Sequence, residues 1–445
     1  MSRAPGSRDR SPVTDLAFAV PGDLAAPTGG YEYARRLIEG LPQHGVAPRL
    51  LALDGTFPAP SAETLAATAN LLGDLPAGTP LLVDGLAYGV LPRAVIRRAG
   101  SRPILALVHH PLCYEAGLSP GRAEALRASE TDALTLADSI VTTSPFTARL
   151  LAEEFDIPQE RMRVARPGTL PAERVPPRQD GEAALLAVGA VTPRKGYGTL
   201  LQALGRLRDR PWRLTVVGAL DRDPQHAREL DGIAEDFGLS DRVAFAGAVS
   251  QAELERLYAA SDVVVSASRF EGYGMALAES LARGLPLVMT RGGAADETVT
   301  DTAAIKVEAG DASALAEALR AMIDDPERRA RLADAAWRAA LETQRSTAFA
   351  KEADTETPLV VAVPETADVL PEVEPVNPVG AILDALPEQI LAWYRPEELD
   401  PEVQAATDLV LDGLGDSLLD HFRASQGRAE PEPDASADKP ERIAA

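Results

Sequence analysis

The chain has 445 residues, of which 67 are acidic and 44 basic, and its formal net charge is −23. Such an acidic surface repels phosphate backbones, so we expect no nucleic-acid partner. Its one cysteine, Cys113, excludes a disulfide within the chain and a cysteine-based metal site, and no stretch reaches the ~18 apolar residues of a membrane-spanning helix. We therefore expect a cytoplasmic protein, with peripheral attachment at the inner face of a membrane left open.

Short apolar runs in the first part of the chain predict buried strands, and amphipathic stretches between them predict helices. Their alternation indicates a parallel sheet covered by helices on both faces. The predicted strands are Leu16–Val20, Arg49–Leu53, Pro80–Gly85, Pro103–Val108 and Ser139–Thr143, and the helices are Tyr31–Leu41, Thr64–Leu72 and Ala123–Leu136.

The same rhythm restarts after a proline-rich, polar stretch at Pro171–Asp180, which we interpret as an interdomain linker. The second set of predicted strands is Ala184–Gly189, Arg213–Gly218, Val243–Gly247, Asp262–Ser266 and Leu285–Thr290. The helices between and after them are Thr199–Leu207, Gln225–Phe237, Gln251–Ala259, Met275–Arg283 and Ala312–Ile323.

Two α/β domains of the doubly wound, Rossmann-like type follow from this pattern, because one core rarely exceeds ~250–300 residues. We place the first at residues 14–170 and the second at residues 181–345. Ligands of such sheets bind beyond the carboxyl ends of the strands, so we expect the site in a cleft between the domains.

The C-terminal segment, residues 346–445, differs in composition. From Lys351 to the end the chain has 22 acidic and 6 basic residues. The helical pattern lapses near Gln344, and the stretch that follows is typical of an extended or disordered tether. An amphipathic helix is predicted over residues 400–422. We expect this tail to bind a protein partner or a membrane surface.

The most informative segment runs from Phe270 into a predicted helix that begins near Gly274. Gly272 and Gly274 allow close approach of the backbone to a ligand, and a helix start offers unpaired N–H groups to phosphate or sugar hydroxyls. Glu271 precedes the helix and Glu279 lies within it, so both carboxylates can face the cleft. The plainer interpretation is a helix with a glycine-rich entry and one solvated glutamate.

This segment resembles the two-glutamate motif of glycosyltransferase family 4, the retaining GT-B enzymes also called glycosyl transferases group 1. The flanking Ala260–Arg269, the turn at Gly284 and the Arg291-Gly-Gly sequence are similar too. The resemblance covers most of residues 14–340 and implies a GT-B fold and transfer of a sugar from a nucleotide sugar. It implies that Glu271 contacts the donor sugar and Glu279 the ribose. The intervening backbone then holds sugar and diphosphate, through Gly272, Tyr273, Gly274 and Met275.

A basic pair, Arg194 and Lys195, lies in the first strand-to-helix turn of the second domain. A cation there can neutralise a departing nucleoside diphosphate, where most charge develops. Lys195 matches the lysine that the family uses for this purpose. The family often has an arginine where this chain has Ala190, and whether Arg194 replaces it is open. The plainer interpretation is an exposed Arg-Lys pair.

In the first domain, Gly29 and Gly30 follow the first strand, and their amides could reach the diphosphate. They do not form a Gly-x-Gly-x-x-Gly fingerprint, so no nicotinamide cofactor is indicated. The resemblance assigns His109, at the end of a strand, to the donor sugar. A histidine pair with His110 could instead bind a metal, although no carboxylate at ligand spacing supports this.

We expect no metal and no cofactor besides the nucleotide sugar, which is a co-substrate. The sequence Asp221-Arg-Asp223 looks like a metal-binding Asp-x-Asp motif, but it falls in a second-domain loop. The expected activity is retaining transfer from a UDP- or GDP-sugar to a hydroxyl of a sugar, a lipid-linked sugar or another acceptor, as in polysaccharide biosynthesis. Two alternatives stay open: another GT-B enzyme such as an epimerase, and a non-catalytic nucleotide-sugar-binding protein whose tail recruits a partner.

Overall fold

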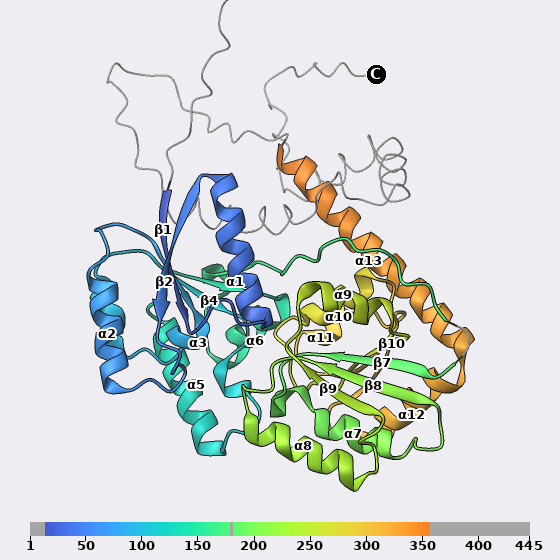
Figure 1. The fold of residues 1–445 in the computed structure, drawn as a ribbon. Coiled ribbons are helices and arrows are strands. Elements are labelled where there is room, and N and C mark those ends of the chain that lie inside the picture. The colour runs from blue at the N-terminus through green and yellow to red at the C-terminus, as the bar shows by residue number, and fades with distance from the viewer. Residues whose placement is uncertain (1–13, 179–180, 356–445) are drawn as a thin grey trace, which may run out of the picture. The chain divides into compact units, whose positions relative to one another are not determined.

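The computed structural model describes residues 14–178 and 181–355, and the side chains of residues 15–178 and 181–343. Two six-stranded sheets follow one another along the chain, and every strand pair within them is parallel. Helices cover them, as Figure 1 shows, blue to teal for the first sheet and green to orange for the second. This confirms the predicted α/β class with two Rossmann-like, doubly wound sheets.

The first sheet has the strand order β2-β1-β3-β4-β5-β6. Its strands are β1 (Thr14–Pro21), β2 (Val46–Leu53), β3 (Leu81–Asp84), β4 (Ile104–Val108), β5 (Ser139–Thr142) and β6 (Met162–Val164). Its helices are α1 (Gly29–Gly40), α2 (Ala62–Gly73), α3 (Gly85–Tyr88), α4 (Arg93–Ile96), α5 (Pro120–Leu134) and α6 (Pro145–Glu154). The order reverses between β1 and β3, and loops leaving such a switch point form a natural ligand site.

The second sheet has the order β12-β11-β10-β7-β8-β9, with its switch point between β7 and β10. Its strands are β7 (Ala183–Val188), β8 (Trp212–Val217), β9 (Val243–Gly247), β10 (Val263–Ser266), β11 (Leu287–Arg291) and β12 (Ala304–Glu308). The helices are α7 (Tyr197–Gly205), α8 (Pro224–Asp236), α9 (Gln251–Ala259), α10 (Met275–Ala282), α11 (Ala295–Thr298), α12 (Ala312–Asp324) and α13 (Pro326–Thr355).

Each sheet buries apolar side chains on both faces, which explains why its central strands read as continuous apolar runs. The edge strands β6 and β12 were not among the predicted strands. They lie at the ends of their sheets and bury few side chains. Two of the three residues of β6 are exposed, and only Ala304 is buried in β12. An edge strand needs fewer apolar residues, so its sequence signal is weak.

The expectation that the helical pattern lapses near Gln344 is wrong for the backbone, because α13 continues to Thr355. Polar residues interrupt an apolar stripe without breaking a helix, and no glycine or proline occurs between Glu327 and Thr357. The helix therefore passes the boundary expected at residue 345. The tether and the helix predicted over residues 400–422 lie outside the described residues.

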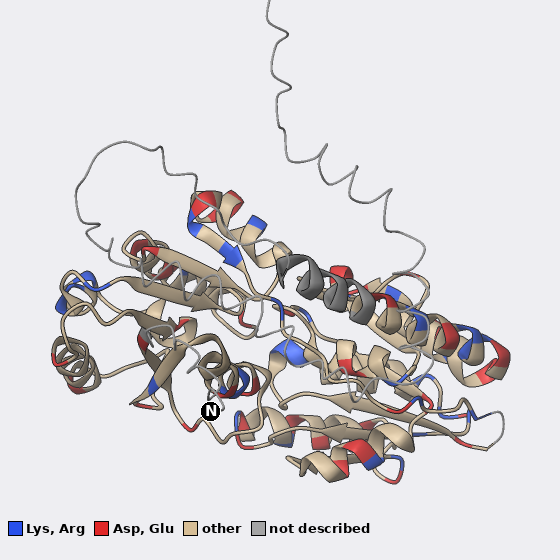
Figure 2. Ribbon diagram, turned by 90° about the horizontal axis from the view of Figure 1, so that it is seen from above, with Lys and Arg blue, Asp and Glu red and all other residues tan. Residues whose placement is uncertain are grey.

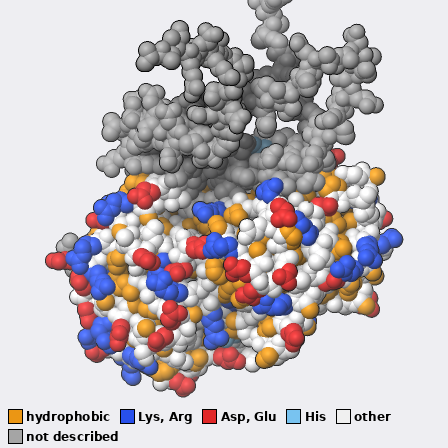
Figure 3. All heavy atoms as spheres, turned by 180° about the vertical axis from the view of Figure 1, so that it is seen from behind, with side chains coloured by type: hydrophobic (Ala, Val, Ile, Leu, Met, Phe, Trp, Pro, Cys, Tyr) orange, Lys and Arg blue, Asp and Glu red, His pale blue; other side chains and the backbone are white. Residues whose placement is uncertain are grey.

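Charged side chains of both signs are interspersed over the described surface. Figure 2 shows Lys and Arg next to Asp and Glu on the helices of both sheets, and Figure 3 shows the same mixture on one face. Many of these residues form ion pairs, for example Arg93 with Asp132 and Arg213 with Glu182. Among the described helices, none is long and apolar enough to cross a membrane.

Candidate active site

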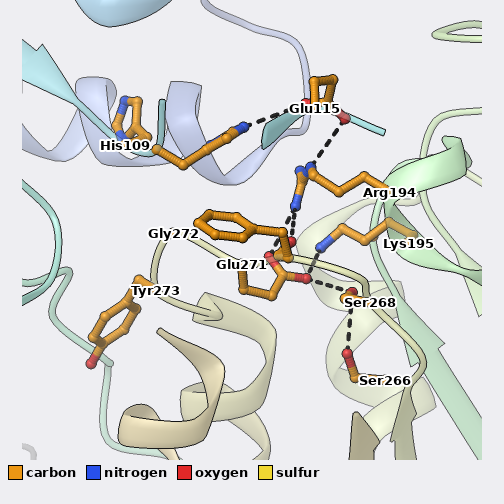
Figure 4. A network of polar contacts seen from close by, with 12 residues as sticks. His109, Glu115, Arg194, Lys195, Ser266, Ser268, Glu271, Gly272 and Tyr273 are labelled. Atoms are coloured by element: carbon orange, nitrogen blue, oxygen red, sulfur yellow. Dashed lines mark hydrogen bonds and ion pairs between the residues drawn. The ribbon is translucent and has the colours of Figure 1, made fainter. Parts of the chain in front are cut away.

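The loops at the carboxyl ends of five strands bring the predicted site residues together. In the first sheet, β1 leads to Gly29 and Gly30, β3 ends at Asp84 and β4 leads to His109. In the second sheet, β7 leads to Arg194 and Lys195, and β10 leads to Glu271. In each sheet, these strands flank the switch point or lie next to a strand that does. Their loops therefore converge. Figure 4 shows this convergence around Glu271.

Glu271 is the centre of a buried polar network. Only 8% of the residue is exposed. Its Oε1 accepts hydrogen bonds from Lys195 Nζ and Ser268 Oγ, both at 2.6 Å. Its Oε2 lies 3.3 Å from Nη1 of Arg194, which also donates to the Phe270 carbonyl at 2.7 Å. The carboxylate is thus held by two cations and a hydroxyl.

These contacts decide the charge of Glu271. Burial alone would raise its pKa, but the positive charges of Lys195 and Arg194 and the hydrogen bonds of Lys195 and Ser268 outweigh burial and lower the pKa to about 2. The carboxylate is therefore ionised at neutral pH and acts only as a hydrogen-bond acceptor. An ionised acceptor of this kind can orient the hydroxyl groups of a sugar.

Two glycines let the loops approach one another. A Cβ atom on Gly196, which has φ of 67°, would lie 2.0 Å from the carbonyl oxygen of Ala267, so only glycine fits between the turn after β7 and the loop after β10. A Cβ atom on Gly272 would lie 2.0 Å from the carbonyl oxygen of His109. These positions allow the Lys195 turn, the Glu271 loop and the His109 loop to meet.

Helix α10 begins directly after this loop. Its N-cap residue is Gly274, which makes no side-chain capping bond and leaves the first N–H groups of the helix without that partner. A Cβ atom on Gly29 would lie 3.4 Å from the sulfur of Met275, so the glycine turn of the first sheet lies beside the start of α10. Backbone amides from both halves of the chain are therefore available to one anionic ligand.

Glu279 lies further along α10, and Oε2 accepts a hydrogen bond from the buried Tyr258 hydroxyl at 3.1 Å. Burial raises its pKa above the usual value, Arg283 and the Tyr258 hydrogen bond lower it, and the negative charges of Glu255 and Glu32 raise it again. Glu32 lies in the first turn of α1, so a charge from the first half of the chain acts on this carboxyl. Its hydrogen-bond partner, Tyr258, is not one of the partners of Glu271.

His109 lies against residues that the sequence analysis did not single out, although its Nε2 atom makes no hydrogen bond to a described residue. Its Nε2 atom lies 3.4 Å from Oδ2 of the buried Asp84, and the ring of Tyr33 packs edge-on against it at 5.4 Å between centroids. A Cβ atom on Gly30 would lie 3.5 Å from the same Nε2. Asp84 ends a buried strand, and a carboxylate at that position was the available sequence signal.

His110 points to the opposite side of the loop, toward the second sheet. Its Nε2 lies 3.4 Å from Oε2 of Glu115, and its ring packs against Phe270 at 5.9 Å between centroids. Burial lowers the pKa of His110. The hydrogen bond to Glu115 acts in the opposite direction and only partly offsets the effect of burial. Glu115 also lies 3.2 Å from Nε of Arg194. Neither Glu115 nor Ser268 had a sequence signal, since their partners are remote or depend on the loop conformation.

Two other motifs lie apart from the network. The Tyr273 ring points away from Glu271 (Figure 4) and lines a cavity of about 180 Å³ together with Ser144, Arg166 and Glu297. The second of these is the Asp221-Arg-Asp223 sequence. There, Asp223 caps α8 by accepting the His226 N–H at 2.9 Å. Arg222 lies over the Tyr31 ring, 5.7 Å from its centroid. Among the described residues, no group of three or more His, Cys, Asp or Glu side chains could hold a metal ion.

Comparisons with known proteins agree with this architecture. Residues 172–338 match the family model described as Glycosyl transferases group 1. A D-inositol 3-phosphate glycosyltransferase of Xylanimonas cellulosilytica is 37% identical over 150 residues, which are 34% of this chain and 36% of that protein. A GDP-mannose-dependent alpha-(1-6)-phosphatidylinositol monomannoside mannosyltransferase of Mycolicibacterium smegmatis is 30% identical over 258 residues, 53% of this chain and 64% of that protein.

The fold is shared with solved structures. That of Anabaena HepE in complex with UDP and glucose superposes with a TM-score of 0.58 at 18% identity, covering 77% of this chain and 100% of that one. At this identity the likeness shows the fold, which is GT-B. The sequence matches to the first curated relatives span about one third to two thirds of their length, from 36% to 64%.

Proposed function

We propose that this chain is a retaining glycosyltransferase, because it has the GT-B fold and its residues 172–338 match the glycosyl transferases group 1 family. It would transfer a sugar from a UDP- or GDP-sugar to a hydroxyl group of an acceptor, on the cytoplasmic side. The observation that carries the proposal is the ionised Glu271 held by Lys195 and Ser268 beside the uncapped start of α10.

The diphosphate of the donor would lie at the start of α10. Its oxygens would accept hydrogen bonds from the amides after Gly272, and from those of Gly29 and Gly30 across the cleft. Lys195 would turn from Glu271 to the phosphate nearest the sugar and stabilise the charge that develops as the bond to the anomeric carbon breaks. Fixed amides and a nearby cation do this without reorganisation of solvent.

The donor sugar would lie between Glu271 and His109. Glu271 accepts hydrogen bonds from sugar hydroxyls, and Ser268 keeps the carboxylate in place when Lys195 moves. His109, whose Nε2 lies 3.4 Å from Oδ2 of Asp84, would contact the sugar from the first sheet. The acceptor hydroxyl would attack from the face that the diphosphate leaves, with a diphosphate oxygen as the base. The anomeric configuration would then be retained.

Glu279 would bind the ribose. Its carboxyl lies in α10 and already accepts a hydrogen bond from Tyr258, which fixes its orientation. Two hydroxyl groups of a ribose could occupy its remaining acceptor positions. Glu279 would then contribute to donor affinity more than to the rate of transfer.

A non-catalytic nucleotide-sugar-binding protein is the second candidate. It is favoured by Ala190, which leaves the turn after β7 with one cation fewer than the family pattern, and by ion pairs that already engage both Arg194 and Lys195. An epimerase acting on nucleotide sugars would use the same donor pocket without an acceptor.

The release of UDP or GDP from a panel of nucleotide sugars, with and without acceptors, separates these functions. A transferase releases nucleoside diphosphate faster when the acceptor is present, and the anomeric proton of the product shows whether configuration is retained. An epimerase changes the donor without an acceptor. Binding without either reaction would support the non-catalytic candidate.

A further inference from the structure

The charged groups around Glu271 balance one another. Lys195 and Arg194 carry two positive charges, and Glu271 and Glu115 carry two negative ones. Burial lowers the pKa of His110, which keeps its imidazole neutral near pH 7. Opposite charges thus already engage both cations, at 2.6 Å for Lys195 and at 3.2 and 3.3 Å for Arg194. A diphosphate brings about two further negative charges, which compete with the two carboxylates for these cations.

The two carboxylates differ in how firmly they are held. The side chain of Glu271 is 11% exposed and has three partners: Lys195, Arg194 and Ser268. The side chain of Glu115 is 42% exposed and lies at longer distances, 3.2 Å from Arg194 and 3.4 Å from His110. Only the Glu115 end of this ion pair is open to water, because Nε of Arg194 is buried and has no hydrogen-bond partner among the described residues. A long ion pair without a hydrogen bond contributes little. Glu115 is therefore the group that leaves at lower cost.

Glu115 also comes from the other half of the chain. It follows the turn Leu112–Tyr114 after β4, whereas Arg194 lies in the turn after β7. The same two loops meet at Gly117, where a Cβ atom would lie 3.8 Å from Pro193. Figure 4 shows Glu115 above Arg194, on the side opposite Glu271. The Glu115 carboxylate thus reaches across to a cation that belongs to the proposed donor site.

We propose that Glu115 is a displaceable counter-ion of Arg194, which the diphosphate of the donor replaces. This inference rests on the proposed function and names a residue that sets the selectivity of the same site. With Glu115 in place, the cluster of Lys195, Arg194, Glu271 and Glu115 is electrically neutral, and it favours only ligands whose phosphate groups engage Arg194 better than the carboxylate does. Binding of the diphosphate frees Glu115 and separates the two loops that it joins.

The test is the affinity of the full-length protein for UDP and GDP, measured by titration calorimetry. Glu115→Gln keeps the size of the side chain and removes its charge, so the Kd of the nucleotide that binds should fall about fivefold. Glu182→Gln is the matched control. Glu182 forms an ion pair with Arg213 and its side chain is 39% exposed, but it precedes β7 at the far end of the sheet. Its Kd should stay within about twofold of the wild type.

A double-variant cycle shows whether Glu115 acts through Arg194. In an Arg194→Gln background, the gain from Glu115→Gln should disappear, because no cation is left for the carboxylate to occupy. An unchanged or higher Kd for Glu115→Gln alone, or a gain that persists without Arg194, would overturn the inference. Nucleotide binding with this gain but without sugar transfer from any donor would instead count against the proposed function. If neither nucleotide binds the wild type or Glu115→Gln, both are wrong.

Discussion

The Nζ atom of Lys195 lies 2.6 Å from Oε1 of Glu271, so the cation assigned to the leaving diphosphate is bonded to the carboxylate assigned to the donor sugar. Each group balances the charge of the other. On binding, the sugar hydroxyls would take the place of Lys195 on the carboxylate, and the phosphate would take the place of Glu271 on the cation. Ser268, which donates to the same Oε1, would hold the carboxylate during this exchange.

Glu271→Gln should lower kcat by about 100-fold or more, because an amide is a weaker acceptor and leaves Lys195 without its counter-charge. The fold should stay intact, as judged by circular dichroism. Steady-state kinetics with the nucleotide sugar that the donor panel selects measure the effect. Glu235→Gln, an exposed change on α8, is the control for the loss of one charge. Near-wild-type turnover of Glu271→Gln would contradict the assigned role.

Glu271 should also make the free energy of unfolding depend on pH in the acid range. The pKa of Glu271 is about 2 in the folded chain, against an ordinary value of 4.5. Its contribution, about 3 kcal/mol at most, is present above pH ~4.5 and is lost as the pH falls toward 2. Urea unfolding between pH 5 and 3 should therefore show a steeper loss for the wild type than for Glu271→Gln. Parallel curves for the two proteins would show that Glu271 is not held by these charges.

The sequence predicted much of this site because its signals are local. The order of residues from Phe270 to Glu279 specifies a loop, a glycine N-cap and a helix, and all are present. The bond between Lys195 and Glu271 could not be predicted, since it depends on the register between β7 and β10. The contact of Glu115 could not be predicted either, because its partner Arg194 is 79 positions away and belongs to the other sheet.

Activity should survive chelation by EDTA, because Lys195 and the helix N-terminus, and no divalent ion, are assigned to the diphosphate. Asp223, the second acid of the Asp-x-Asp sequence, already caps α8. The measurement is the initial rate with and without excess EDTA, followed by addition of Mn²⁺ or Mg²⁺. A loss that these ions restore would give Asp221 and Asp223 a role in metal binding.

A chain shortened to residues 1–355 should keep its donor affinity and most of its nucleotide release. It retains α13 to its last residue, Thr355, together with every residue assigned to the site. What it should lose is a protein partner, membrane attachment or oligomeric state that depends on the acidic tail. Calorimetry with the nucleotide and light scattering measure the two effects. Loss of donor binding would make the tail part of the catalytic fold.

Glu130 should reduce stability as the pH rises, the opposite of Glu271. It is 1% exposed in α5, and its Oε2 accepts the Leu112 N–H at 2.8 Å. Burial raises its pKa to about 8, although that hydrogen bond and the charge of Arg127 oppose the rise. Between pH ~4.5 and 8 the folded chain therefore holds a proton that the unfolded chain has released. By linkage, folding becomes less favourable across this range, by up to a few kcal/mol.

Glu130→Gln should remove this dependence, because the amide is neutral at every pH and its oxygen can still accept the Leu112 N–H. Urea unfolding at pH 5, 6.5 and 8 should show the wild type losing stability relative to Glu130→Gln as the pH rises. Glu124→Gln, an exposed change on the same helix, should follow the wild type. Because Leu112 begins the turn that leads to Glu115, a variant that keeps this hydrogen bond should also keep its nucleotide affinity. An equal pH dependence in Glu130→Gln and the wild type would mean that Glu130 is ionised in the folded chain.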